Sequence, residues 1–214
     1  QFERMVFTQA QSAAVVKKAK ELGVTVTALL GAIGSQATAA IVCDEQGESA
    51  DVLQWVSLVD SQRYFERLLT DDLLRAYITT HSAVYEHVAQ QSIDGLAKLF
   101  YADLDTALAS DAPLSQAKGF AAFLPDTVGD ADACMANYRW PFPTHLTSNM
   151  GCLPIEEQYD TLIVSDFNFG GPPSAFFRCP YLTFTTVNSF ADKLYVVLTM
   201  CVPINPPERV KRIA

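Results

Sequence analysis

The stretch ELGVTVTALLGAIGSQATAAIVCDE, residues 21–45, decides what kind of protein this is, because no charged side chain lies between Glu21 and Asp44. A membrane span, a glycine-rich phosphate-binding loop and a buried helix of a globular protein can all share this lack of charge. The three kinds of segment differ in the length and the glycine spacing that they require, so the stretch can be tested against each.

As a membrane span the stretch is short and weakly apolar. Its helical part, ALLGAIGSQATAAIV, has about 15 residues and would rise about 23 Å, less than the apolar thickness of a bilayer. Ser35, Gln36 and Thr38 interrupt it. As a phosphate-binding loop, GAIGS lacks the third glycine and follows no clear strand. The stretch therefore predicts a buried helix with Thr25 or Thr27 as its N-cap.

Small residues recur along this predicted helix, and they favour close packing against a neighbouring element. They are Gly31, Ala32, Gly34, Ser35 and Ala39. A helix that is apolar on most of its surface and carries such residues is typical of the interior of a domain.

The composition of the chain is that of a globular protein. Half of the 214 residues are hydrophobic and only 18% are charged, which allows one large domain or two small ones. The net charge of −9 argues against nucleic acid as a partner, and there is no polybasic patch for a membrane surface. The five cysteines include no CxxC pair, so we expect free thiols in a reducing cytoplasm rather than a zinc ribbon.

The chain begins QFERMVF, without an initiator methionine, and this charged start does not have the pattern expected of a signal peptide. We therefore expect the chain to be a piece of a longer protein.

Hydrophobic periodicity predicts helices and strands in both halves of the chain. Helices are predicted over 9–22, 28–42, 92–110, 113–125 and 206–213. Strands are predicted for VLQWVSLVD within 50–65, and over 73–88, 145–151, 159–170, 175–190 and 193–203. Gly23 is the expected stop signal of the first helix, and 126–144 reads as a long connection. This order predicts an α/β (α+β layered) fold with a mixed β-sheet covered by helices.

The residues alone offer no convincing catalytic centre. His81, His87 and His145 are the three histidines, and none lies in a metalloprotease motif or beside a carboxylate at ligand spacing. We expect each to be a core or surface histidine, because a catalytic histidine needs a shaped site and an orienting partner. There is no GxSxG elbow, and no metal site is predicted.

Five local patterns, taken in order, resemble the C-terminal half of the condensation-domain acyltransferase superfamily. The patterns are AKELGVTVTALLGAIGSQA, VSLVDSQRYF, HLTSNMGCLP, SDFNFGGP and TFTTVNSFADKLYVVLTM. The superfamily includes nonribosomal peptide condensation domains, polyketide-associated acyltransferases, alcohol acetyltransferases and plant BAHD acyltransferases. The resemblance implies a chloramphenicol-acetyltransferase-like half and a role in secondary metabolism. SDFNFGGP departs from the plant DFGWG motif at its central Gly–Trp pair, which puts a plant-type assignment in doubt.

The catalytic signature of the superfamily, His-x-x-x-Asp, is absent. The residues four positions after the three histidines are Tyr85, Gln91 and Asn149. In the superfamily this motif lies in the N-terminal half. The resemblance therefore implies that residues 1–214 are a single C-terminal acyltransferase subdomain. Its partner would be the N-terminal half of the same enzyme, as a second chain or a cleaved fragment.

The resemblance also implies a reaction and a site. The donor would be acyl-CoA or a phosphopantetheine thioester, used as a co-substrate with no bound cofactor, and the acceptor a small-molecule alcohol or amine. The C-terminal half would supply tunnel wall and a crossover strand, with Thr147, Ser148, Asn149 and Gly151 as substrate-binding residues. The same Asn and Gly would also suit an ordinary turn at a strand end.

Four further residues are expected to be structural. Arg63 is expected to pair with Asp60 or with a backbone carbonyl. Asp166 is a candidate partner for an arginine that holds the two halves together, or else a solvated carboxylate at a strand end. Gly170 ends the DFGWG-like segment.

Two other functions remain open at this point. The chain could be a non-catalytic binding or docking module that kept the fold and lost the chemistry. It could also be a stand-alone esterase, which would require a site of serine, histidine and acid built from one of the three histidines.

Overall fold

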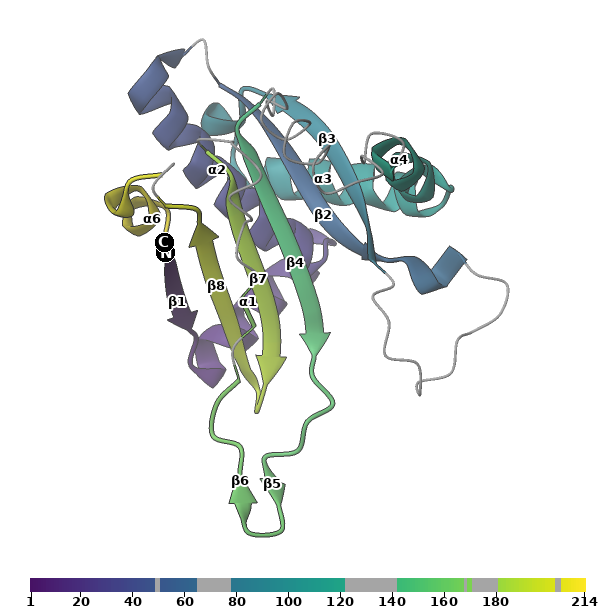
Figure 1. The fold of residues 1–214 in the computed structure, drawn as a ribbon, viewed down its shortest axis with the longest axis vertical. Coiled ribbons are helices and arrows are strands. Elements are labelled where there is room, and N and C mark those ends of the chain that lie inside the picture. Colours follow the sequence, from purple (N-terminus) through teal and green to yellow (C-terminus); the bar gives the residue numbers. More distant parts are fainter. Residues whose placement is uncertain (49–50, 65–77, 122–141, 168, 171–180, 203–204) are drawn as a thin grey trace, which may run out of the picture.

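The computed structural model describes residues 1–48, 51–64, 78–121, 142–167, 169–170, 181–202 and 205–214. Six strands form one sheet in the order β1–β8–β7–β4–β2–β3 (Figure 1). Their bounds are β1 Phe2–Val6, β2 Val52–Asp60, β3 Ile78–Glu86, β4 Thr144–Cys152, β7 Thr183–Phe190 and β8 Lys193–Met200.

The sheet is mixed, as the sequence predicts. β2, β4 and β7 are parallel neighbours, whereas β3, β8 and β1 join them through antiparallel pairs. Because parallel strands point the same way, the carboxyl ends of β2, β4 and β7 meet at one edge, which we call the carboxyl edge. The α/β class with a helix-covered mixed sheet is therefore confirmed.

Three helices cover one face of this sheet: α1 Gln9–Leu22, α2 Val26–Gln46 and α3 Ile93–Leu108 (Figure 1). The polar residue before each helix caps it, and Thr25 is one of the two caps predicted for the uncharged stretch. Thr8 forms a capping box with Gln11, Thr25 accepts from the backbone of Ala28, and Ser92 accepts from the backbone of Gly95. α1 has the predicted bounds and ends at Gly23, whose φ of 71° is left-handed. We call the opposite side of the sheet the outer face.

α2 is the buried helix predicted from the uncharged stretch, and it is longer than expected, with 21 residues. By length and composition alone it could cross a membrane. Its apolar side chains instead belong to the core of the domain, where Ala28, Leu29 and Ala32 cluster with Trp55 and Phe100. The glycines explain the close approach, because a Cβ on Gly31 would lie 2.7 Å from Nε1 of Trp55.

The strands differ from the prediction in two places. The first strand, β1, was not predicted, although it pairs along its whole length with β8. The predicted strand over 159–170 is wrong, because only β5 Gln158–Tyr159 and β6 Leu162–Ile163 pair there, as a two-residue ladder. Asp160, with a φ of 52°, makes the turn between them. Residues 65–77 and 122–141, including most of the predicted long connection, lie outside the described residues.

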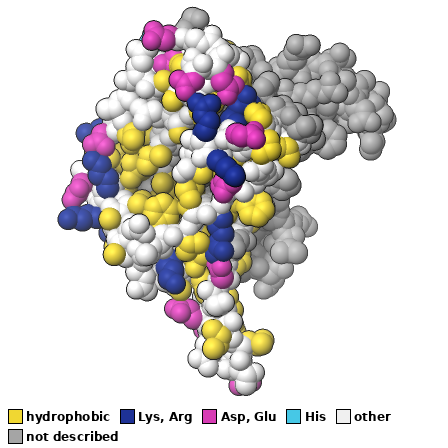
Figure 2. All heavy atoms as spheres, turned by 90° about the vertical axis from the view of Figure 1, so that its left-hand side faces the viewer, with side chains coloured by type: hydrophobic (Ala, Val, Ile, Leu, Met, Phe, Trp, Pro, Cys, Tyr) yellow, Lys and Arg dark blue, Asp and Glu magenta, His cyan; other side chains and the backbone are white. Residues whose placement is uncertain are grey.

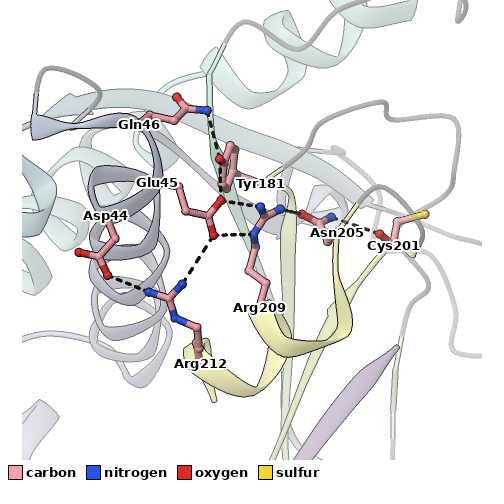
Figure 3. A network of polar contacts seen from close by, with 8 residues as sticks. All are labelled: Asp44, Glu45, Gln46, Tyr181, Cys201, Asn205, Arg209 and Arg212. Atoms are coloured by element: carbon pink, nitrogen blue, oxygen red, sulfur yellow. Dashed lines mark hydrogen bonds and ion pairs between the residues drawn. The ribbon is translucent and has the colours of Figure 1, made fainter.

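The remaining helices are α4 Ala112–Ala121, beside β3, and α6 Pro207–Ile213, near the C-terminus. A polar network fixes α6 to the end of α2 (Figure 3). Arg209 of α6 donates from Nη2 to Glu45 Oε2 at 2.6 Å and from Nη1 to Asn205 Oδ1 at 2.7 Å, and its guanidinium stacks 4.4 Å from the Tyr181 ring. Burial alone would raise the pKa of Glu45, but hydrogen bonds from Arg209 and Tyr181 outweigh it and lower the pKa.

Candidate functional site

The carboxyl end of β4 carries the predicted substrate-binding residues, and the pleat of the strand separates them onto two faces. Successive side chains of a strand point to opposite sides. His145 contacts Gly34 of α2, so the residues at odd positions lie under the helices. Ser148 lies on the outer face. The four residues therefore do not share one surface.

Thr147 is buried on the helix-covered face. Its Oγ1 accepts a hydrogen bond of 3.1 Å from Nε1 of Trp55, whose indole ring stacks on Phe100. The hydroxyl of Thr147 therefore bonds within the core, and it holds Trp55 in place on the helix-covered face.

Asn149 and Gly151 shape the end of the strand. Nδ2 of Asn149 donates to Thr27 Oγ1 at 3.0 Å, and Oδ1 accepts from the backbone N–H of Gly151 at 2.8 Å. Gly151 has a φ of 70°, and the pairing between β4 and β7 shifts register between Asn149 and Cys152. Asn149 therefore ties the first turn of α2 to a bulge, the kind of irregularity that re-aims a strand beside functional sites.

Sequence reasoning missed the residue that lies beside this bulge. Asn188 of β7 is buried, and neither atom of its amide has a hydrogen-bond partner among the residues that the structure describes. It faces outward together with Ser148 and Thr186, since Val187 between them packs on Leu30 of α2. The signal in the sequence was an asparagine inside the β-rich run TFTTVNSF, where asparagine is disfavoured.

The segment around Asp166 and Gly170 crosses this part of the outer face. Asp166 forms an ion pair with Arg4 of β1, an arginine of this same chain. Thr186 Oγ1 donates to the carbonyl of Phe169, and Gly170 lies over Val197 of β8.

Tyr195 lies opposite Asn188 on β8, with the guanidinium of Arg4 5.7 Å from its ring. Burial, followed by the charge of Asp166, raises the pKa of Tyr195. The outer face here is therefore polar but well covered.

Asp60 and Arg63 lie where β2 ends at the same edge. Oδ1 of Asp60 accepts from the backbone N–H of Gln62 at 2.9 Å, and this opens a short 3₁₀ turn over Ser61–Tyr64. The guanidinium of Arg63 lies 6.0 Å from the Tyr64 ring. Their expected pairing with each other stays a prediction.

A hairpin arm, β5 and β6, projects from the carboxyl edge between β4 and β7 (Figure 1). Its apolar side chains are exposed: Tyr159 by 46%, Leu162 by 71% and Ile163 by 75%. Figure 2 shows hydrophobic side chains at this protruding lower end of the molecule. Apolar side chains exposed together on a projecting element are typical of a contact surface.

The three histidines have different surroundings. His145 is fully buried, and burial lowers its pKa to about 3, so its ring is neutral. Its Nδ1 lies 2.7 Å from Oγ1 of Thr183. His87 is exposed and has a φ of 57°. Neither geometry suits a general base that must reach a substrate.

His81 is the histidine with an acidic partner, which its position in the sequence did not indicate. Its Nε2 lies 2.9 Å from Oδ2 of Asp103 on α3, and the hydroxyl of Tyr85 donates to the same oxygen at 2.5 Å. Burial, followed by Asp103, raises the pKa of Tyr85. Ser57 lies opposite His81 in the β2–β3 register.

The residue types of an esterase are thus together on the helix-covered face. However, Ser57 is only 1% and His81 only 5% exposed, and both lie beneath the core helices, so an ester could reach them only if a helix moved away from the sheet. Among the residues that the structure describes, no group of three or more His, Cys, Asp or Glu side chains could hold a metal ion.

Comparison with known sequence families gives a match over most of the chain. Residues 1–198 match the family described as phthiocerol/phthiodiolone dimycocerosyl transferase C-terminus. No curated protein matches the chain.

Solved structures share the fold at low sequence identity. Polyketide synthase associated protein 5 from Mycobacterium tuberculosis is 13% identical with a TM-score of 0.66, over 100% of this chain and 49% of that one. TRI3 trichothecene 15-O-acetyltransferase from Fusarium sporotrichioides is 13% identical with a TM-score of 0.66, over 100% of this chain and 45% of that one. F. sporotrichioides TRI101, complexed with coenzyme A and T-2, is 12% identical with a TM-score of 0.65, over 99% of this chain and 48% of that one. The chain therefore spans about half the length of these proteins.

Proposed function

Since this chain belongs to the family of phthiocerol/phthiodiolone dimycocerosyl transferase C-termini, we propose that it is the C-terminal half of a thioester-dependent acyltransferase. The donor is acyl-CoA or a carrier-protein phosphopantetheine thioester, and the acceptor is an alcohol or an amine. The observation that carries the proposal is the family match over residues 1–198. The half-length coverage of the related structures supports a second half elsewhere.

In this proposal the catalytic base is a histidine of the N-terminal half. It takes the proton of the acceptor, whose oxygen or nitrogen attacks the thioester carbonyl. The tetrahedral intermediate collapses with cleavage of the C–S bond, and the proton passes to the departing thiolate. Preorganised donors around the oxyanion stabilise the charge that develops.

The end of β4 contributes binding and shape rather than chemistry. Ser148 on the outer face is the predicted hydroxyl that contacts substrate. Asn149 and Gly151 set the bulge that presents it, and Thr147 supports the strand from behind through Trp55. Asp166 joins the crossing segment to β1 through Arg4, and Gly170 lies beside Val197 of β8.

The hairpin arm is the proposed contact with the N-terminal half. Tyr159, Leu162 and Ile163 would be buried against that half, in line with the crossover strand expected from the sequence. We propose a cytoplasmic location, which suits the free thiols of Cys43, Cys152 and Cys201.

The test uses the protein that carries both halves. The purified protein is incubated with acyl-CoA and a panel of alcohols and amines, and acyl transfer is followed by release of free thiol and by the mass of the product. Transfer that disappears when the histidine of the His-x-x-x-Asp motif is replaced by alanine is the expected result. A protein without that motif, or with no transfer from any thioester, would instead be a docking module.

The arm is tested separately. Leu162→Asp and Ile163→Asp should weaken association of the two halves expressed as separate chains, whereas Asp160→Asn at the same turn should not. Association that is unchanged by both aspartate variants would rule out the arm as the contact.

A further inference from the structure

Asn188 carries a polar group that the fold leaves unused. The side chain is 1% exposed, yet within the described part of the chain neither Oδ1 nor Nδ2 has a hydrogen-bond partner. Burying an amide without partners costs stability, and replacing it with an apolar group of similar shape is often neutral or favourable. A partner absent from this chain would explain why an asparagine stands here.

The position of Asn188 connects it to the candidate site. It lies on the outer face, directly opposite Tyr195. On its other side the β4–β7 pairing shifts register between Asn149 and Cys152. Ser148, the outward-facing residue of β4, lies level with Thr186 of β7, one outward position before Asn188.

The described residues of the segment that crosses this face are held to the sheet by an ion pair and a hydrogen bond. Asp166 is joined to Arg4 by an ion pair with partly exposed side chains, and such pairs contribute little to stability. A hydrogen bond joins Thr186 to the carbonyl of Phe169. Gly170 lies near Val197, since a Cβ built on it would be 3.6 Å from Cγ1 of that valine. A ligand that reaches Asn188 would have to break these contacts between described residues.

We propose that Asn188 is a further substrate-binding residue, whose carboxamide pairs with a secondary amide of the pantetheine arm of the thioester donor. This inference rests on the proposed acyltransferase function. A secondary amide has one N–H and one C=O, and a carboxamide offers the complementary acceptor and donor in one plane. Coenzyme A and a carrier protein present the same arm, so both donors meet the same group.

The experiment compares donors with and without amides in the protein that carries both halves. One acyl group is supplied as the CoA thioester, as the thioester of a phosphopantetheinyl carrier protein, and as the ethanethiol thioester, which has no amide. Asn188→Leu should lower kcat/KM about 10- to 100-fold for a donor that carries the arm, since two hydrogen bonds are lost. It should lower kcat/KM for the ethanethiol thioester less than about threefold. A loss with only one of the two pantetheine donors identifies the natural source of the arm.

Thr186→Val is the matched control. This substitution removes the hydrogen bond to the carbonyl of Phe169 and leaves the amide of Asn188 in place. It should therefore change kcat/KM by the same factor for all three donors. Equal losses for all three donors in Asn188→Leu would overturn the assignment. A wild-type protein that transfers nothing from any donor would overturn the proposed function and this assignment with it.

Folding provides an independent readout. Asn188→Leu should unfold at a denaturant concentration equal to or above that of the wild type, because it removes an unpaired buried amide. A clear loss of stability would show that the amide has a structural partner, and would also overturn the assignment.

Discussion

The imidazole of His145 lies directly against the backbone of Gly34, where α2 crosses β4. A Cβ on Gly34 would lie 2.2 Å from Cε1 and 2.4 Å from Nε2 of the ring. Because His145 is fully buried and held by Thr183, the ring cannot move aside cheaply. Gly34→Ala should therefore lower the free energy of unfolding by about 1–3 kcal/mol, although alanine is the better helix former by up to about 1 kcal/mol. Urea denaturation measures the change.

The control for Gly34 is the same substitution in a background without the ring. In His145→Ala, the added methyl group meets empty space, so Gly34→Ala should be neutral or stabilising there. Equal effects in both backgrounds would show that the two residues are not coupled.

His145 should also make stability depend on pH. Burial lowers its folded pKa to about 3, whereas the unfolded chain has a pKa of about 6.5. Between these two values the unfolded state binds the extra proton, so stability falls as pH falls from about 6.5 towards about 3. The slope from this one group is at most about 1.4 kcal/mol per pH unit. Above pH 6.5 it contributes no slope.

The measurement is the difference between wild type and His145→Gln in urea denaturation at several pH values. The difference cancels the carboxylates, which titrate in both proteins. It should be constant above pH 7 and should shrink on acidification. A difference that does not vary between pH 7 and pH 4 would show that the ring is accessible to protons in the folded state.

Thr147 is expected to matter for folding through its hydroxyl. Thr147→Val removes the acceptor of the Trp55 indole N–H and leaves that donor buried without a partner, at a cost of about 1–3 kcal/mol. Thr147→Ser keeps the acceptor and should cost less. Both are followed by denaturation monitored by tryptophan fluorescence. If valine proves as stable as threonine, the hydroxyl does not serve Trp55.

Substitutions in the β7–β8 hairpin turn are expected to raise the stability of the protein. Ala191 and Asp192 both have positive φ, 51° and 58°, in a two-residue loop between Phe190 and Lys193. Such turns favour Asn followed by Gly. The double variant Ala191→Asn, Asp192→Gly should raise the free energy of unfolding by about 1–2 kcal/mol. Ala191→Val should lower it, since a β-branched residue resists this conformation. The opposite order of stabilities would contradict the turn geometry.

Local patterns predicted most elements well, because their signals lie within a few residues. α1 and β2 have the expected bounds, since a cap and a period of hydrophobic residues define each. β1 escaped prediction because its five residues are half exposed and gain their order from β8, almost two hundred residues away. The arm escaped because two paired residues on each side leave too short a pattern.

The candidate site was only partly predictable for a related reason. The strand HLTSNMG, residues 145–151, was predicted and lies within β4, and its period of two already separates Thr147 from Ser148. Only the position of α2 decides which of the two is covered. Likewise, Asp103 reaches His81 from a helix, and no spacing in the sequence indicated that contact.

By itself, the sequence determined that the uncharged stretch forms a buried helix, that helices cover a mixed sheet, and that no His-x-x-x-Asp motif is present. These properties follow from composition and from short-range periodicity. The tertiary structure alone decided that Gly34 contacts His145 and that Thr147 bonds to Trp55 in the core. It also decided that Asn188 is buried with an amide that has no partner among the described residues. Such contacts join residues far apart in the chain, and they depend on which face of each strand the helices cover.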